Sequence, residues 1–354
     1  MHMADALVTP SVAGAMWAVS AAAIAFSSRK VHNDLDERRV PLMGVLGAFI
    51  FAAQMINFTI PGTGSSGHLG GGVLLAVLLG PHAAFLTISS VLFVQAFFFA
   101  DGGLLALGCN IFNIGFLPAF ICYPLLYRPL AGTTASAGRR GAAAVVTAVT
   151  ALQAGALGVV LQTTISGIAQ LPFSIFLWLM LPIHLAIGLV EGVVTAALLT
   201  FISKARPDIL DATPQPGMAA RRSTGPVLIS FLLAAAVTGG VVSWFASEKP
   251  DGLEWSIAKA SGQEELPLPE GKMHRLMGKV QEGVALLPDY SFRTAAGEGN
   301  GEAGRAGTSV AGLVGGVVTL MVALLGGMLL KWVCRHAHSG RTSLERREAP
   351  PEVR

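Results

Sequence analysis

Long apolar segments without charge recur along the chain and predict helices that cross a membrane. Each segment has about 18 residues or more, which is the length needed to cross the roughly 30 Å hydrocarbon core of a bilayer. Shorter polar segments separate them. The pattern predicts an all-α fold, a polytopic membrane helical bundle of about seven spans followed by a two-span module, with candidate spans at residues 8–26, 42–60, 63–80, 83–100, 104–126, 142–165, 174–202, 227–245 and 310–333.

Composition supports a membrane protein. Hydrophobic residues make up 53% of the 354 residues and charged residues 13%, whereas soluble proteins carry about 25% charged residues. The net charge of +3 is spread over the loops, so nucleic acid is not an expected partner. Cys109, Cys122 and Cys334 lie in or beside apolar segments without CxxC spacing, which indicates neither a disulfide framework nor a thiolate metal site.

The basic residues predict the orientation in the membrane. With the N-terminus outside, the lysines and arginines of every short loop fall on the inside, and only the long segment 247–308 carries them outside. No basic residue precedes the first apolar segment, unlike in a signal peptide, so this segment is expected to remain as a span. We therefore expect a multi-pass protein of the plasma or inner membrane with a cytoplasmic C-terminus.

One apolar region is interrupted by small residues. The sequence PGTGSSGHLGGG places His68 among glycines and serines, beside a segment barely long enough to cross the bilayer. Irregular backbone at membrane depth is tolerated where it lines a cavity, and interrupted segments often form a substrate site. The alternative is close helix packing through GxxxG spacing. We favour packing for Gly188/Gly192 and Gly312/Gly316, and a site around His68.

The chain begins Met-His, which offers a chelate for a transition metal. The amine of Met1 and the backbone nitrogen of His2 would close a five-membered ring on an ion, and the His2 backbone nitrogen and Nδ1 a six-membered ring. One planar position is left, which His68 could fill. Four planar nitrogens suit Ni(II) or Cu(II), and Co(II) less well, whereas Zn(II) prefers a tetrahedron. The alternative is that His2 has no function.

The segment MHMADALVTP resembles the N-terminus of the CbiM/NikM family, the substrate-binding membrane components of energy-coupling-factor transporters for cobalt and nickel. The resemblance continues through FAAQMINFTIPGTGSSGHLGGGVLLAVLLGPHAAFL and VLFVQAFFFADGGLLALGCNIFNIG. It implies that Met1, His2 and His68 hold the metal, and that Ni(II) or Co(II) is transported cargo rather than a prosthetic group. Ala6 departs from the usual glycine, and His82 is not expected to be a ligand.

A second resemblance follows in SEKPDGLEWSIAK and LLPDYSFR, which look like the PDGLE/NikN-type partner of two spans joined by an external loop. Pro250, Asp251, Gly252, Leu253 and Glu254 are the first candidates for its function. The predicted organisation is a metal-binding membrane domain at 1–205, a cytoplasmic linker at 206–226, a PDGLE-like domain at 227–335 with its external loop at 247–308, and a cytoplasmic tail at 336–354.

The resemblance also implies separate partners, a CbiQ/NikQ-like transmembrane coupling subunit and CbiO/NikO-like cytoplasmic ATPases. The chain has no GxxxxGK[ST] motif of its own, so it is not expected to hydrolyse ATP or to be an enzyme. Two other functions stay open, a stand-alone proton-coupled metal transporter and a membrane metal sensor. No residue decides between cobalt and nickel.

Polar residues in or beside the recognised stretches are candidates to orient the metal-bound imidazoles, because such an imidazole usually donates its other N–H to a carboxylate, amide or carbonyl. Hydrogen bonding between helices is the alternative, and Asp101 could instead cap the following helix. His184 and Glu191, seven residues apart, could form an ion pair, a proton relay or a subunit contact. The orienting candidates are Asp5, Gln54, Asn57, Gln95, Asp101, Asn110 and Asn113.

Overall fold

The computed structural model describes the chain except residues 35–38, 133–135, 207–224, 264–265, 293–301 and 349–354. Most of the predicted linker 206–226 therefore lies outside the described residues. The elements follow in the order η1 (Asp5–Leu7), α1 (Pro10–Asp34), α2 (Arg39–Gln54), β1 (Phe58–Ile60), β2 (Ser65–Gly67), α3 (Gly72–Leu79), α4 (Pro81–Phe98), α5 (Leu107–Asn110), η2 (Ile111–Tyr127), α6 (Arg128–Ala131), α7 (Ala137–Ser166), α8 (Phe173–Ala205), α9 (Gly225–Gly240), η4 (Val242–Phe245), α10 (Gly252–Ser261), α11 (Lys272–Val284), η5 (Pro288–Tyr290) and α12 (Glu302–Glu348).

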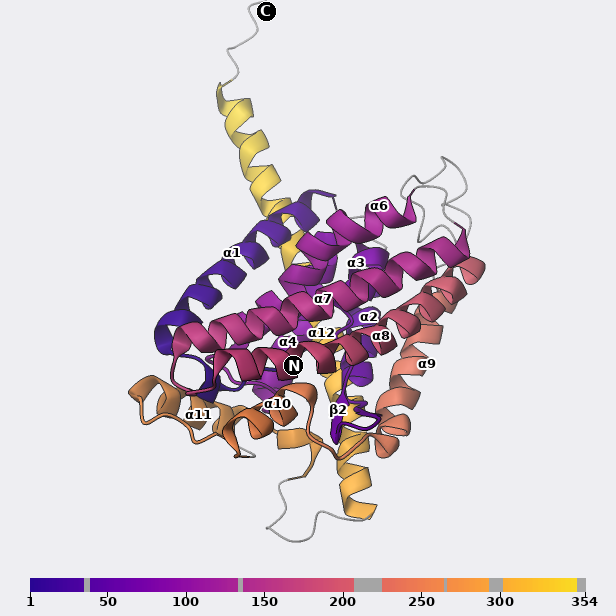
Figure 1. The fold of residues 1–354 in the computed structure, drawn as a ribbon. Coiled ribbons are helices and arrows are strands. Elements are labelled where there is room, and N and C mark those ends of the chain that lie inside the picture. The colour runs from indigo at the N-terminus through magenta and orange to yellow at the C-terminus, as the bar shows by residue number, and fades with distance from the viewer. Residues whose placement is uncertain (35–38, 133–135, 207–224, 264–265, 293–301, 349–354) are drawn as a thin grey trace, which may run out of the picture.

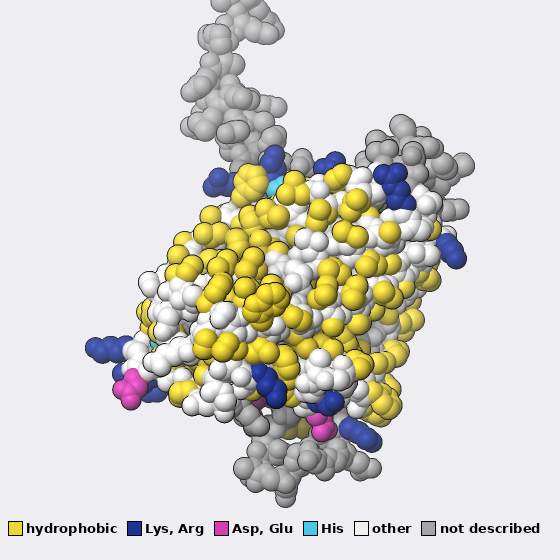
Figure 2. Space-filling model, in the orientation of Figure 1, with side chains coloured by type: hydrophobic (Ala, Val, Ile, Leu, Met, Phe, Trp, Pro, Cys, Tyr) yellow, Lys and Arg dark blue, Asp and Glu magenta, His cyan; other side chains and the backbone are white. Residues whose placement is uncertain are grey.

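Six helical stretches in the described chain are long and apolar enough to cross a membrane, and two apolar helices are shorter. Large apolar side chains such as Trp178, which is 74% exposed, lie on the outside of the bundle. Figure 2 shows hydrophobic side chains over the middle of the visible face, with lysines and arginines toward its ends. The predicted all-α polytopic bundle is confirmed. The six long stretches are Pro10–His32, Pro81–Phe98, Leu107–Ala131, Ala137–Ser166, Phe173–Ala205 and Arg305–Leu329.

The prediction of a helical span over residues 63–80 is wrong. Residues 58–67 form the small antiparallel hairpin β1–β2, and α3 has only eight residues, about 12 Å of helix. The chain between β2 and α3 is not helical, and it contains His68. Hydropathy did not reveal this break, because the residues of the broken segment are as apolar or as small as those of a helix.

Small residues let the helices approach closely at the GxxxG pairs of α8 and α12, as the packing interpretation expects. A β-carbon at Gly188 would lie 2.9 Å from Val149 Cα, and one at Gly192 would lie 2.7 Å from Val145 Cα. Helix α7 thus packs tightly along α8 (Figure 1). Gly312 of α12 similarly faces Gly239 of α9.

The predicted external loop is folded where it is described, and it packs across one end of the bundle. Helices α10 and α11 lie at the end where the N-terminus is found (Figure 1). The backbone N–H of Leu286 donates to the Phe98 carbonyl at 2.9 Å, and that of Ser66 donates to the Pro250 carbonyl at 2.8 Å. Backbone hydrogen bonds therefore join this loop to α4 and to the hairpin. Helix α12 continues to Glu348, so the tail predicted from residue 336 is mostly helical.

Candidate metal centre

Most of the first eight residues lie inside the protein, although Ala4 is exposed and His2 is half-buried. Met3 and Val8 are fully buried and Met1 is 6% exposed. The side chain of Asn110 accepts a hydrogen bond from the Met3 N–H at 2.7 Å and donates one to the Met3 carbonyl at 3.2 Å. Buried backbone polar groups need such partners. Asn110 therefore fixes the segment that carries the N-terminal amine.

Asp5 and Asn113 also hold the N-terminal segment. Asp5 Oδ1 accepts a hydrogen bond from the Ala106 N–H at 3.0 Å, and burial raises the pKa of Asp5. Asn113 Nδ2 lies 3.8 Å from Met3 Sδ and bonds Gln162 Oε1 at 2.8 Å. Both residues thus position backbone and Met3 rather than an imidazole. Ala6 lies in the short helix η1 without a left-handed backbone, so its replacement of glycine causes no strain.

The N-terminal amine and His68 are neighbours. Met1 N lies 3.1 Å from His68 Nε2. His68 Nδ1 lies 3.1 Å from the Leu69 carbonyl oxygen, which can only accept, so Nδ1 carries the proton and Nε2 presents its lone pair. The ring is therefore in the tautomer that a metal ligand requires.

Side chains of three helices, α2, α4 and α8, hold the loop that carries His68. Gln54 Nε2 of α2 donates to the Gly70 carbonyl at 2.8 Å, and Gln95 Nε2 of α4 donates to Gln54 Oε1 at 2.8 Å. On the other side, the carboxylate of Glu191 in α8 accepts the N–H groups of Gly70 at 2.7 Å and Gly71 at 3.1 Å. Glu191, left without a role by the sequence, therefore fixes this loop.

Glycine is required in this loop for two physical reasons. Gly71 has φ of 76°, a left-handed conformation that favours glycine. A β-carbon at Gly67 would overlap the side chain of Ile187 in α8. The chain can therefore lie directly against α8 at Gly67 only because this position lacks a side chain, and Gly71 in the same way lies against Ile50 of α2.

His2 is close to His68, and its ring is bound to a carboxylate. The two imidazoles stack with ring centroids 5.0 Å apart. His2 Nδ1 lies 3.0 Å from Asp101 Oδ1, and the hydroxyl of Tyr290 donates to Asp101 Oδ2 at 2.5 Å. Burial alone would raise the pKa of Asp101, but His2 and the hydrogen bonds hold it below its ordinary value. His2 Nε2 is buried without a partner.

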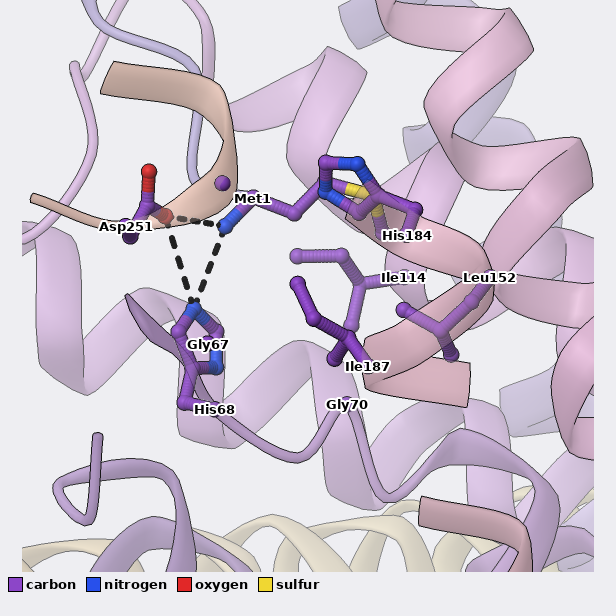
Figure 3. A pocket seen from close by; sticks show the side chains of 10 residues that line it. Met1, Gly67, His68, Gly70, Ile114, Leu152, His184, Ile187 and Asp251 are labelled. Carbon is purple, nitrogen blue, oxygen red and sulfur yellow. Dashed lines mark hydrogen bonds and ion pairs between the residues drawn. The ribbon is translucent and has the colours of Figure 1, made fainter. Parts of the chain in front are cut away.

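One contact at the amine comes from the PDGLE segment. Asp251 Oδ2 lies 2.6 Å from Met1 N and 3.8 Å from His68 Nε2 (Figure 3). Burial would raise the pKa of Asp251, but the amine and His68 hold it well below its ordinary value. The sequence identified Asp251 only as part of the motif PDGLE. Its contact with the amine joins residues 250 positions apart.

Two cavities adjoin these residues. A small one of about 10 Å³ is lined by Met1, His68, Asp251 and His184, among others. A larger one of about 440 Å³ lies between the bundle and the α10–α11 segment and reaches both His2 and His68. The described residues that line it include no lysine or arginine. Its carboxylates are those of Asp5, Asp101, Asp251, Glu254 and Asp289.

The remaining candidates do not contact the imidazoles of His2 and His68. Asn57 lines the larger cavity, and its Oδ1 is buried without a partner. His82 lies on α4 with its Nδ1 3.4 Å from Ser27 Oγ. His184 bonds the Met180 carbonyl at 2.8 Å and makes no ion pair with Glu191. Asp101 does not cap the next helix, α5, whose N-cap residue is Ala106, and the Ala106 N–H donates to Asp5 Oδ1.

Among the described residues, no group of three or more His, Cys, Asp or Glu side chains has the arrangement of a metal site. The donors gathered around Met1 are of a different kind, because a backbone amine contributes.

Comparison with known proteins matches both parts of the chain. The family described as cobalt uptake substrate-specific transmembrane region, CbiM, matches residues 2–209, and the PDGLE domain matches residues 225–332. The putative fused nickel transport protein NikMN of Archaeoglobus fulgidus is 33% identical over 330 residues, which cover 90% of this chain and 96% of that protein.

Two further relatives represent the fused and the unfused form. The fused nickel transport protein NikMN of Rhodobacter capsulatus is 27% identical, over 82% of this chain and 88% of that protein. The cobalt transport protein CbiM of Sorangium cellulosum is 33% identical, over 60% of this chain and 95% of that protein. The chain thus belongs to the CbiM/NikM family of membrane proteins for cobalt and nickel transport, with a NikN-like PDGLE domain fused to it.

Proposed function

We propose that this protein is the metal-capturing membrane component of an energy-coupling-factor importer for divalent nickel or cobalt. The amine of Met1, the amide and imidazole nitrogens of His2, and His68 Nε2 would hold the ion. The observation that carries the proposal is the separation of 3.1 Å between Met1 N and His68 Nε2. Two nitrogens bound at right angles to one ion, each about 2.0–2.1 Å from it, lie about 2.9 Å apart.

Binding would require one rearrangement at His2. Its Nδ1 lies 3.0 Å from Asp101 Oδ1, so the ring has to exchange this partner for the ion when the planar chelate closes. The ring stacks on His68 with centroids 5.0 Å apart, which supports its part in the proposed site. Asp101 and Tyr290 would hold the ring until the ion arrives.

Loading would release protons, because amine and amide nitrogens bind an ion only after losing one. When the amine begins as an ammonium group and the His2 amide carries its hydrogen, two protons leave for each ion bound. We therefore expect the apparent affinity to fall as the pH is lowered. Isothermal titration calorimetry in buffers of different ionisation enthalpy would count the protons.

The ion would enter from outside through the larger cavity, whose carboxylates attract a dication. Inward release would follow movement against a separate transmembrane coupling subunit, driven by cytoplasmic ATPases. The affinity has to differ between the two states, since equal affinity would shift no equilibrium. We place the N-terminus outside and the C-terminus in the cytoplasm, as the basic residues predict.

The test is to measure bound Ni(II) and Co(II) in the purified protein before and after the four residues Gly-Ser-Gly-Ser are added in front of Met1. A single added glycine would not serve, because Gly-Met-His carries an amine, two amides and an imidazole that can hold an ion by themselves. The longer extension moves the free amine away from both His2 and His68, so the stoichiometry is expected to fall from one ion to near zero. The matched control carries the same four residues at the C-terminus and is expected to bind normally. Full binding by the N-terminally extended protein would exclude the amine from the site.

A second measurement separates this proposal from a stand-alone proton-coupled transporter. Liposomes that contain the purified chain alone are expected to accumulate no metal above equilibrium, with or without a pH gradient. Accumulation driven by the pH gradient would instead support the stand-alone transporter. In cells, accumulation that depends on the ATPase subunits would exclude a sensor.

A further inference from the structure

The fused PDGLE domain contributes a carboxylate to the candidate metal centre. Asp251 Oδ2 lies 2.6 Å from Met1 N and 3.8 Å from His68 Nε2 (Figure 3). Asp101, another acidic residue that lines the larger cavity, contacts His2 instead. Asp251 is therefore the acidic group in direct contact with the amine.

The two carboxylate oxygens of Asp251 make different contacts. Oδ1 accepts hydrogen bonds from the backbone N–H groups of Leu253 and Glu254, both at 2.8 Å, and so caps α10. The Glu254 side chain in turn accepts from the Asp251 N–H at 2.9 Å, which completes a capping box. Because the cap fixes the side chain, Oδ2 is held in one direction, toward Met1 and His68.

Residues of the CbiM-like domain also fix the segment that carries Asp251. A β-carbon at Gly252 would lie 3.1 Å from side-chain atoms of Ile183 and Ile187 and 3.2 Å from His184 Cε1. The hydroxyl of Ser66, two residues before His68, donates to the Lys249 carbonyl at 2.7 Å. The position of the carboxylate is thus set by α8 and by the hairpin that leads into the His68 loop.

A buried dication needs negative charge nearby, because an uncompensated charge away from water is costly. The four nitrogens of the proposed site bring one negative charge, that of the deprotonated His2 amide, against the two positive charges of the ion. One positive charge remains. The carboxylate of Asp251 offsets it after loading, just as it offsets the ammonium group before loading.

We propose that Asp251 is the anionic member of the metal centre, so that the site is shared between the two fused domains. This inference rests on the proposed function and extends it to the purpose of the PDGLE domain. The Oδ2 of Asp251 lies beside two of the atoms proposed to bind the ion, 2.6 Å from Met1 N and 3.8 Å from His68 Nε2, so its charge acts next to the ion while the four nitrogens keep the planar positions.

The experiment compares charge-removing variants in the same segment. Asp251→Asn and Asp251→Ser each keep an oxygen that can cap α10, and each removes the charge near the amine. Glu248→Gln is the matched control, since it removes one negative charge three residues before Asp251, from an exposed side chain that lines neither cavity. Affinity for Ni(II) and Co(II) is measured by competition with a chelator, on the full-length protein in nanodiscs.

Both Asp251 variants are expected to bind Ni(II) at least about 10-fold more weakly, within the 10–100-fold range of groups that support a metal site. Glu248→Gln is expected to stay within about threefold of the wild type. Far-ultraviolet circular dichroism spectra of the metal-free variants should match that of the wild type, which separates the effect on the ion from a loss of the fold. Wild-type affinity in both Asp251 variants, or an equal loss in Glu248→Gln, would overturn the inference.

The two proposals fail in different ways. If the wild-type chain binds neither metal, the proposed function is wrong whatever the variants do. If the wild type binds one ion and loses it on N-terminal extension, while Asp251→Asn binds like the wild type, only the shared site is wrong.

Discussion

Two non-helical segments meet at the candidate metal centre, and they are held by different parts of the bundle. The N-terminal segment is fixed to α5 and its flanks through Asn110 and through Asp5, which bonds the Ala106 N–H. The loop of His68 is fixed to α2 through Gln54 and to α8 through Glu191. The amine and the imidazole therefore belong to different supports.

This difference indicates how the ion could be released. A shift of α8 relative to α5 would carry the Gly70 and Gly71 backbone with Glu191, while Asn110 would keep Met3 in place. Met1 and His68 would then separate. Because α8 also contacts the segment of Asp251 through Gly252, the same shift would disturb the carboxylate. Variants that weaken one support at a time test this view.

His68→Ala should have the largest effect, because it removes the one ligand that the loop brings. We expect more than about 100-fold weaker Ni(II) binding, beyond the 10–100-fold range of supporting residues. Isothermal titration calorimetry measures the affinity, and His82→Ala on α4 is the control. Retention of wild-type affinity in His68→Ala would show that the loop is not part of the site.

Asn110→Ala should come next, since it weakens the support of the N-terminal segment. The Met3 N–H would lose its partner in a buried place, at a cost of about 1–3 kcal/mol, whereas the Met3 carbonyl would lose the Asn110 bond and keep the one from the Gly103 N–H. We expect about 10-fold weaker metal binding, which chelator competition would measure. Asn110→Asp, which keeps an acceptor for the Met3 N–H, should lose less, and an equal loss would contradict this account.

Glu191→Gln should have a smaller effect, because it weakens the support of the loop that carries His68. A glutamine oxygen can still accept from one of the two glycine N–H groups, but it gives up the charge-assisted character of the bonds. We expect about three- to tenfold weaker binding and faster metal dissociation, measured by stopped-flow chelation. If dissociation is unchanged, Glu191 does not hold the His68 loop in the bound state.

Asn57→Ala should have the smallest effect. Asn57 was a candidate to orient an imidazole, but its Oδ1 has no hydrogen-bond partner and it belongs to neither support. We expect the affinity for Ni(II) to stay within about threefold of the wild type, measured in the same titration as the other variants. A loss as large as that of Asn110→Ala would show that the larger cavity contributes to binding.

Much of this architecture could be predicted from the sequence. Apolar segments of bilayer length predicted the long helices, and the glycines and serines around His68 predicted irregular backbone there. The Met-His start and the resemblance to CbiM proteins predicted that residues 1, 2 and 68 belong together, and the structure brings them within contact.

The rest could not be predicted, because it depends on contacts between distant parts of the chain. Periodicity does not show that Glu191 accepts hydrogen bonds from Gly70 and Gly71, since their spacing is more than a hundred residues. Nor does any local pattern place Asp251 beside the amine. Hydropathy also predicted one continuous span over residues 63–80, where the structure has part of a hairpin, a loop and the short helix α3.

The ion pair between Met1 and Asp251 has a consequence for biosynthesis. The two residues are 250 positions apart, and a ribosome adds about 5–20 residues per second. Synthesis of the residues between Met1 and Asp251 therefore takes on the order of tens of seconds. An unfinished chain can expose the amine and His68, but it lacks the acidic group that completes their surroundings.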